Sequence, residues 1–126
     1  MLRNLLDSSR KFYALLALAL AAVYGKALGF EFLSYDDYFH VTNNVLVNGG
    51  ELSSLGRIWS ESIHGLYVPV TYTFWLLEAK LSLWFWGRLN PGFFHAVSLL
   101  LHLAVLVSAD RYFSERFENK RAVRLG

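Results

Sequence analysis

The chain has 126 residues, of which 55% are hydrophobic and 17% aromatic, and it contains no cysteine. This length has room for one domain. Without cysteine the chain has no disulfide, no thiolate metal site and no cysteine nucleophile. It also lacks a phosphate-binding glycine loop and a metal-ligand cluster, and nothing in it supports nucleic-acid binding. We therefore expect neither a metal nor a cofactor.

The formal net charge of +2 is distributed unevenly along the chain. Basic residues gather in residues 1–12 and 109–126, at the two ends. The stretch between them has four basic and six acidic residues, a net charge of −2. An acidic middle between basic ends is informative about orientation in a membrane, because cytoplasmic segments are enriched in Lys and Arg.

The first apolar block, residues 12–33, predicts a transmembrane helix. About 20 helical residues are needed to cross ~30 Å of hydrocarbon, and only Lys26 and Glu31 interrupt this block. A cleavable signal peptide is the competing interpretation, because Arg10 and Lys11 precede a short apolar core. The apolar sequence that continues after Lys26 favours a retained helix.

Residues 92–110 predict a second transmembrane helix, since residues 93–109 carry no charge. Residues 111–126 are then predicted to form a basic cytoplasmic tail. The positive-inside rule places both termini in the cytoplasm and residues 34–90 outside, in the periplasm. We expect an integral membrane protein of the bacterial inner membrane.

Residues 34–65 are predicted to form an external loop with an acidic motif and a short helix over residues 52–63. Residues 66–88 then predict a long amphipathic helix in the membrane interface. A third crossing is the alternative, but Glu78 and Lys80 would be costly at bilayer depth. The predicted fold is therefore an all-α membrane protein in which two transmembrane helices flank an external loop with a short helix and a long interfacial amphipathic helix.

Three segments carry a resemblance to a known family. They are, in chain order, Tyr35-Asp36-Asp37 with Val41-Thr42-Asn43-Asn44 and Val47, then Tyr67-Val68-Pro69-Val70-Thr71-Tyr72-Thr73-Phe74-Trp75-Leu76, and finally Leu89-Asn90-Pro91-Gly92-Phe93-Phe94-His95-Ala96-Val97-Ser98-Leu99-Leu100-Leu101-His102. Together they resemble the amino-terminal part of membrane glycosyltransferases with the GT-C fold, in the branch of tetratricopeptide-repeat O-mannosyltransferases and their bacterial relatives. In that family a first helix crosses the membrane, a long external loop carries an acidic catalytic motif, and a second helix returns.

The resemblance implies a glycosyltransferase whose donor is a sugar on a polyprenyl phosphate. Asp36 or Asp37 would be the catalytic base that removes a proton from an acceptor hydroxyl as it attacks the anomeric carbon. A solvated acidic stop at the end of a span is the alternative. The predicted substrate-binding residues are His40, Arg57, His64, Tyr67 and Tyr72, although both histidines could also be ordinary interfacial residues.

Two departures from the family pattern limit this prediction. Val68 stands where the family has a basic residue that could neutralise the donor phosphate, and Arg57, Lys80 or Arg88 is a candidate replacement. Family members also have many more membrane helices. We therefore expect this module to be truncated, split between chains, or inactive on its own.

His95 and His102 are seven residues apart and share one helix face with Ser98. Intramembrane polar residues usually face protein rather than lipid, so we predict a helix-packing face, with a pigment or haem site as the alternative. This face leads to a second hypothesis, a non-catalytic subunit that packs against and stabilises a larger membrane complex. The expected partners are membrane lipids, other membrane protein chains and, in an active enzyme, a polyprenyl-phosphate sugar, but not nucleic acid.

Overall fold

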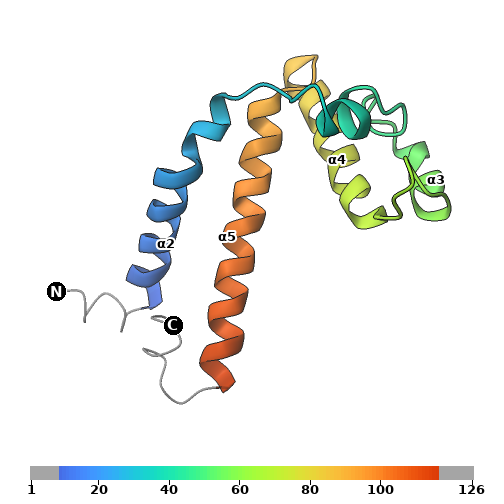
Figure 1. Cartoon of the computed structure of the whole chain (residues 1–126). Coiled ribbons are helices and arrows are strands. Elements are labelled where there is room, and N and C mark those ends of the chain that lie inside the picture. Colours follow the sequence, from blue (N-terminus) through green and yellow to red (C-terminus); the bar gives the residue numbers. More distant parts are fainter. Residues whose placement is uncertain (1–8, 117–126) are drawn as a thin grey trace. The chain divides into compact units, whose positions relative to one another are not determined.

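The computed structural model describes residues 9–116, which form helices and connecting turns without a β-strand (Figure 1). The all-α prediction is confirmed at this level. The chain divides into two compact units. Unit 1 comprises the residues up to Ala27 and those from Ser98 onward, and unit 2 comprises Leu28–Val97. The predicted tail beyond residue 116 lies outside the described residues, as do residues 1–8.

Two helices are long and apolar enough to cross a membrane, Arg10–Gly29 and Pro91–Arg116. The first consists of α2 (Ser9–Tyr24) and the 3₁₀ helix η1 (Gly25–Gly29), and the second is α5 (Pro91–Arg116). They agree with the two predicted spans in number and order. The first ends before the predicted residue 33, where two glycines weaken the helix. The second continues past residue 110, because no Gly or Pro stops it before residue 116.

Within unit 1, α2 and α5 contact each other at two levels. The Tyr13 hydroxyl donates to Asp110 Oδ2 at 2.9 Å, and the rings of Tyr24 and His102 meet edge-on with centroids 6.2 Å apart. Residue numbers rise along α2 as they fall along α5, so the two helices are antiparallel. Only 6% of each apolar window is buried inside the chain, which leaves most of these side chains for lipid or other helices to cover.

Unit 2 has a hydrophobic core between its short helices and one long helix. The elements are η2 (Tyr38–Thr42), η3 (Leu52–Ser54), α3 (Leu55–Ser60), α4 (Pro69–Trp86) and the first turns of α5. The core residues are Val41, Leu46, Val47, Ile58, Ile63, Tyr72, Leu76, Ala79 and Phe94. The predicted short helix over residues 52–63 is present only to Ser60, because His64 and Gly65 take left-handed conformations that turn the chain back toward α4.

Local backbone chemistry explains where α4 begins and ends. Pro69 occupies the first turn, and the preceding Val68 is excluded from helical geometry by the proline ring. Gly87 ends the helix in a left-handed conformation with φ of 66°, and its N–H donates to the Leu83 carbonyl at 2.9 Å. The helix therefore covers residues 69–86 rather than the predicted 66–88.

The side chains of α4 do not divide simply into a polar exposed side and an apolar buried side. The buried side includes two polar residues, Glu78 and Ser82, whereas the exposed side includes large apolar residues such as Phe74 and Trp84. A helix with apolar side chains all round is normally covered on every side.

Two glycines allow close backbone contacts in unit 2. A Cβ on Gly50 would lie 2.7 Å from Lys80 Cα, and Gly50 has a φ of +63°. A Cβ on Gly92 would lie 2.6 Å from the Leu28 carbonyl oxygen. These contacts place the loop after η2 against α4 and the end of η1 against the start of α5.

Candidate functional site

The acidic pair lies in the segment that enters η2, and its two carboxylates have different surroundings. Asp37 Oδ2 accepts the Leu33 N–H at 2.8 Å, which fixes the turn between the first apolar helix and η2. The Asp36 side chain is exposed and makes no hydrogen bond to any of residues 9–116. Asp36 is thus free to meet a ligand, whereas Asp37 holds the backbone.

His40 follows Asp36 by four residues in a continuous helical segment, so both side chains lie on the same side. The Nδ1 atom of His40 lies 2.7 Å from the hydroxyl oxygen of Tyr72, which is fully buried on α4. Asn44 stabilises this turn with two hydrogen bonds. Its side-chain amide donates to the His40 carbonyl at 3.2 Å, and its Oδ1 accepts the Leu46 N–H at 3.0 Å.

Three aromatic rings lie against the His40 ring, and a fourth packs on one of these three. We call these five residues the His40 cluster: Phe39, His40, His64, Tyr72 and Trp75. The His64 ring meets His40 edge-on at 5.6 Å, and Trp75 lies at 6.2 Å. Phe39 packs on His64 at 6.1 Å, and Tyr72 packs on Trp75 at 5.4 Å. The left-handed conformation of His64, with φ of 50°, places its ring in this cluster.

The Tyr72 hydroxyl determines what His40 offers to a ligand. Burial raises the pKa of Tyr72, so its hydroxyl carries a proton that it can donate to Nδ1 of His40. In the His40 tautomer that accepts this proton at Nδ1, the ring proton is on Nε2, which can then donate to a hydroxyl or phosphate oxygen. Among residues 9–116 no group of three or more His, Cys, Asp or Glu side chains is placed to hold a metal ion.

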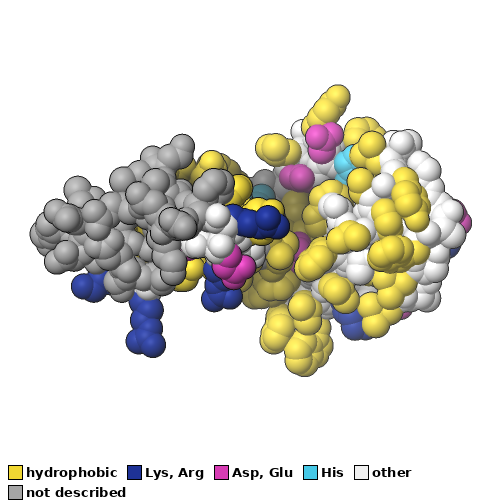
Figure 2. All heavy atoms as spheres, turned by 90° about the horizontal axis from the view of Figure 1, so that it is seen from below, with side chains coloured by type: hydrophobic (Ala, Val, Ile, Leu, Met, Phe, Trp, Pro, Cys, Tyr) yellow, Lys and Arg dark blue, Asp and Glu magenta, His cyan; other side chains and the backbone are white. Residues whose placement is uncertain are grey.

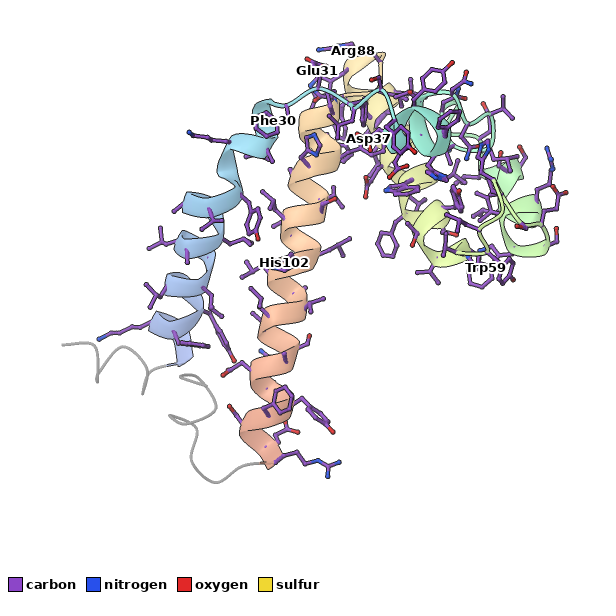
Figure 3. All side chains as sticks on the ribbon, viewed as in Figure 1. Phe30, Glu31, Asp37, Trp59, Arg88 and His102 are labelled. Carbon is purple, nitrogen blue, oxygen red and sulfur yellow. The ribbon has the colours of Figure 1, made fainter. Side chains whose placement is uncertain are left out.

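Two predicted substrate-binding residues make their contacts elsewhere. Arg57 forms an exposed ion pair with Glu61, with Nη2 and Oε2 3.0 Å apart, and this pairing raises the pKa of Arg57 and lowers that of Glu61. The Tyr67 hydroxyl donates to the Trp59 carbonyl at 2.9 Å. Figure 3 shows Trp59 and Asp37 at different ends of unit 2. Neither Arg57 nor Tyr67 makes a hydrogen bond or ring contact with the His40 cluster.

Two residues of interest were not singled out as site residues from the sequence. Trp75 belongs to the His40 cluster, and its position three residues after Tyr72 on one helix was the available signal. Glu78 is 5% exposed, and its Oε2 atom has no hydrogen-bond partner among the described residues. Burial raises the pKa of Glu78 to about 7. Its burial could not be read from local sequence, although the buried Ser82 lies on the same side one turn later.

The predicted helix-packing residues are divided between the two units. His102 contacts Tyr24 in unit 1, and Ser98 is exposed there without a hydrogen bond to the described residues. His95 belongs to unit 2, where its Nε2 atom is buried without a partner among residues 9–116. The three side chains therefore share a helix face without sharing a contact.

Protein-family models, curated proteins and solved structures were compared with this chain, and none of them matches it. The relation to GT-C fold glycosyltransferases stays a prediction from the three segments.

Proposed function

We propose that this chain is the amino-terminal module of a GT-C-like membrane glycosyltransferase that uses a sugar carried on a polyprenyl phosphate. The observation that carries the proposal is the exposed, unbonded Asp36 carboxylate on the same helical side as His40. Asp36 comes seven residues after the end, at Gly29, of a helix that is apolar enough to cross a membrane. A charged group at a membrane surface that is neither paired nor needed for the fold is a functional candidate.

In the proposed reaction, Asp36 removes the proton from an acceptor hydroxyl while the hydroxyl oxygen attacks the anomeric carbon of the donor sugar. The bond between that carbon and the phosphate oxygen breaks, and polyprenyl phosphate leaves. General-base help of this kind contributes roughly 10²–10⁴-fold in rate. Asp37 is a positioning residue, because its carboxylate holds the Leu33 N–H and so orients the turn that presents Asp36.

The His40 cluster supplies the second part of the proposed site. Its His40 Nε2 proton is available to the donor phosphate or a sugar hydroxyl, and the Trp75 ring offers an apolar wall. This contact would replace the basic residue that the family has at the position of Val68. Arg57 is the weaker candidate for that replacement, because Glu61 already holds its guanidinium.

The proposed arrangement puts both termini in the cytoplasm and residues 34–90 on the external side. Helix α4 then lies in the membrane interface rather than across the bilayer. Its composition supports this placement, since α4 is not among the helices apolar enough to span. Further helices, supplied by other membrane proteins or by sequence outside this chain, would complete the donor cavity against the exposed faces of α2 and α5.

A non-catalytic subunit is the second candidate, and the exposure of the two apolar helices favours it. Leu18 is 68% exposed on α2, and Leu100 is 66% exposed on α5. Such surfaces suit packing against the helices of a larger membrane complex. In that case the acidic pair would be a solvated stop without a role in catalysis.

Release of polyprenyl phosphate from a panel of polyprenyl-phosphate sugars, measured in membranes that contain the chain, tests the first proposal. We expect Asp36→Asn to reduce release by at least ~100-fold, the low end of general-base effects. Glu51→Gln, which changes another exposed acid of the same loop, should leave release unchanged. Native mass spectrometry of the detergent-extracted variants would show whether assembly with partner chains persists.

The outcomes separate the two candidates. Loss of release with assembly retained supports the enzyme. Full release after the double change Asp36→Asn with Asp37→Asn would end the catalytic proposal. A different pattern would favour the subunit. In that pattern the membranes show no transferase activity, the Asp variants still assemble with partner chains, and His102→Leu does not.

A further inference from the structure

Six exposed apolar side chains form one continuous stripe along the outside of α4. They are Val70, Phe74, Leu77, Leu81, Trp84 and Phe85, with exposed fractions between 42% and 76%. At 3.6 residues per turn they occupy roughly 100° of the helix circumference and extend for roughly 22 Å. We call this set the α4 stripe. Hydrophobic side chains cover much of the face of unit 2 that Figure 2 shows.

Much of the rest of the α4 circumference packs inside unit 2, although Thr71, Lys80 and Trp86 are exposed. Tyr72, Leu76 and Ala79 face the core, and Glu78 and Ser82 are buried beside them. No polar residue lies within the stripe itself, since Thr73 and Lys80 border one edge and Glu78 borders the other. An uninterrupted exposed apolar surface of this kind marks a site that contacts another apolar phase or molecule.

Two basic residues lie beside the stripe, and the exposed acid Glu51 is next to Gly50, which approaches Lys80. Lys80 is exposed at its edge, and Arg88 is exposed two residues beyond the end of the helix. The single acid of α4, Glu78, is turned inward and 5% exposed, so it adds no exposed negative charge to this face. Cationic side chains beside an apolar, aromatic-rich surface are complementary to anionic lipid headgroups.

The chain length between α4 and α5 keeps the stripe close to the proposed bilayer. Trp86 ends α4 and Pro91 begins α5, so the two helix ends are at most roughly 17 Å apart. When α5 crosses the membrane, the carboxyl-terminal end of α4 lies within reach of the bilayer surface. Trp84 and Phe85 are at that end of the stripe, and aromatic residues of this type concentrate at the interface.

We propose that the α4 stripe is the membrane-inserting face of unit 2 and that its occupant is an anionic lipid surface. The six side chains enter the boundary between headgroups and acyl chains, to a depth of roughly 5–10 Å, while Lys80 and Arg88 stay at the level of the phosphates. This inference rests on the interfacial placement of α4 in the proposed function, and not on glycosyl transfer.

Nitroxide spin labels test the proposal cleanly, because the chain has no cysteine of its own. The full chain with Leu77→Cys or Leu81→Cys is labelled and reconstituted into phosphatidylcholine vesicles with or without phosphatidylglycerol. Collision with oxygen reports lipid, and collision with a water-soluble nickel chelate reports water. Ser53→Cys, an exposed loop position, is the water-facing control. Circular dichroism checks that each variant keeps its helices.

We expect both stripe labels to lose collisions with the nickel chelate and gain collisions with oxygen relative to Ser53→Cys. Phosphatidylglycerol should deepen both labels, and Lys80→Gln with Arg88→Gln should remove that deepening. Three results would overturn the proposal: water exposure equal to the control, loss of both kinds of collision as in a contact with protein, or a label depth near the bilayer midplane as in a third crossing. A depth that does not respond to phosphatidylglycerol would overturn the preference for anionic lipid. None of these readouts depends on transferase activity.

Discussion

Glu78 is a carboxylic acid in the interior of unit 2 whose Oε2 atom has no hydrogen-bond partner among the described residues. Burial disfavours its charged form and raises its pKa to about 7, from 4.5 in an exposed state. Between these two values the folded chain binds more protons than the unfolded chain. Stability therefore falls as pH rises through this window, and the contribution of Glu78 does not change with pH above or below it. The difference corresponds to about 3 kcal/mol across the window.

We predict that Glu78→Gln removes this pH dependence, because an amide of the same shape carries no charge at any pH. Thermal unfolding of the full chain in detergent micelles at pH 5 and pH 8 would measure it. The midpoint of the variant, relative to that of the natural chain, should rise between the two pH values. Glu51→Gln, at an exposed position, serves as the control and should leave the profile unchanged. Parallel profiles for Glu78→Gln and the natural chain would contradict the prediction.

At the scale of single residues, the sequence indicated candidate side chains for the site, but not which of them contact one another. His40, His64 and Tyr72 were named separately, and the structure brings them together although up to 32 residues separate them. Long-range proximity of this kind depends on packing that no local pattern reveals. The Arg57–Glu61 ion pair could have been predicted from the sequence, because side chains four residues apart on a helix contact each other. This ion pair argues against an Arg57 that is free to bind substrate at the site.

At the scale of elements, the helix boundaries that depend on local backbone chemistry were predictable. Pro69 and Gly87 mark the start and end of α4 for steric reasons that act within a few residues. The burial of Glu78 and Ser82 was not predictable in the same way. Which face of a helix is covered depends on the elements that pack against it, and these come from distant parts of the chain.

Gly50 lies close to the backbone of α4. We therefore predict that alanine destabilises unit 2 at Gly50 but not at the neighbouring Gly49. Gly50→Ala should destabilise unit 2 by about 1–3 kcal/mol, because the new Cβ would lie 2.7 Å from Lys80 Cα and the residue has a φ of +63°. Gly49→Ala is the matched control, since its Cβ would meet nothing closer than Glu51 Cγ at 3.7 Å.

Thermal unfolding of both variants would measure the effect. Only Gly50→Ala should show a lower midpoint, and the loss should be accompanied by weaker protection of α4 amides from hydrogen exchange. If the two substitutions lower the unfolding midpoint equally, the loop does not approach α4 as closely as the structure shows.

At the scale of the whole molecule, charge and hydropathy lead to one topology. If both helices that are suited to crossing a membrane do cross it, the chain returns to the side from which it started. The residues between them carry net negative charge, whereas Arg111 and Arg116 lie in the last turns of the second helix. Lys and Arg near the ends of spans stay in the cytoplasm. The proposed site, Asp36 with the His40 cluster, then faces the external side, where polyprenyl-linked sugars would have to be presented to it.

Cysteine labelling in sealed, right-side-out vesicles tests this topology. We predict that Ser53→Cys reacts with a membrane-impermeant maleimide from outside, since Ser53 is exposed in the loop between the spans. Tyr112→Cys, 56% exposed near the end of α5, should react only after the vesicles are permeabilised. The two positions act as controls for each other, because both side chains are accessible and the chain has no other thiol. The reverse pattern would invert the orientation and move the acidic pair to the cytoplasm. Labelling of both positions from outside would mean that α5 does not cross the membrane. The enzyme proposal, which depends on two membrane-spanning helices, would then be contradicted.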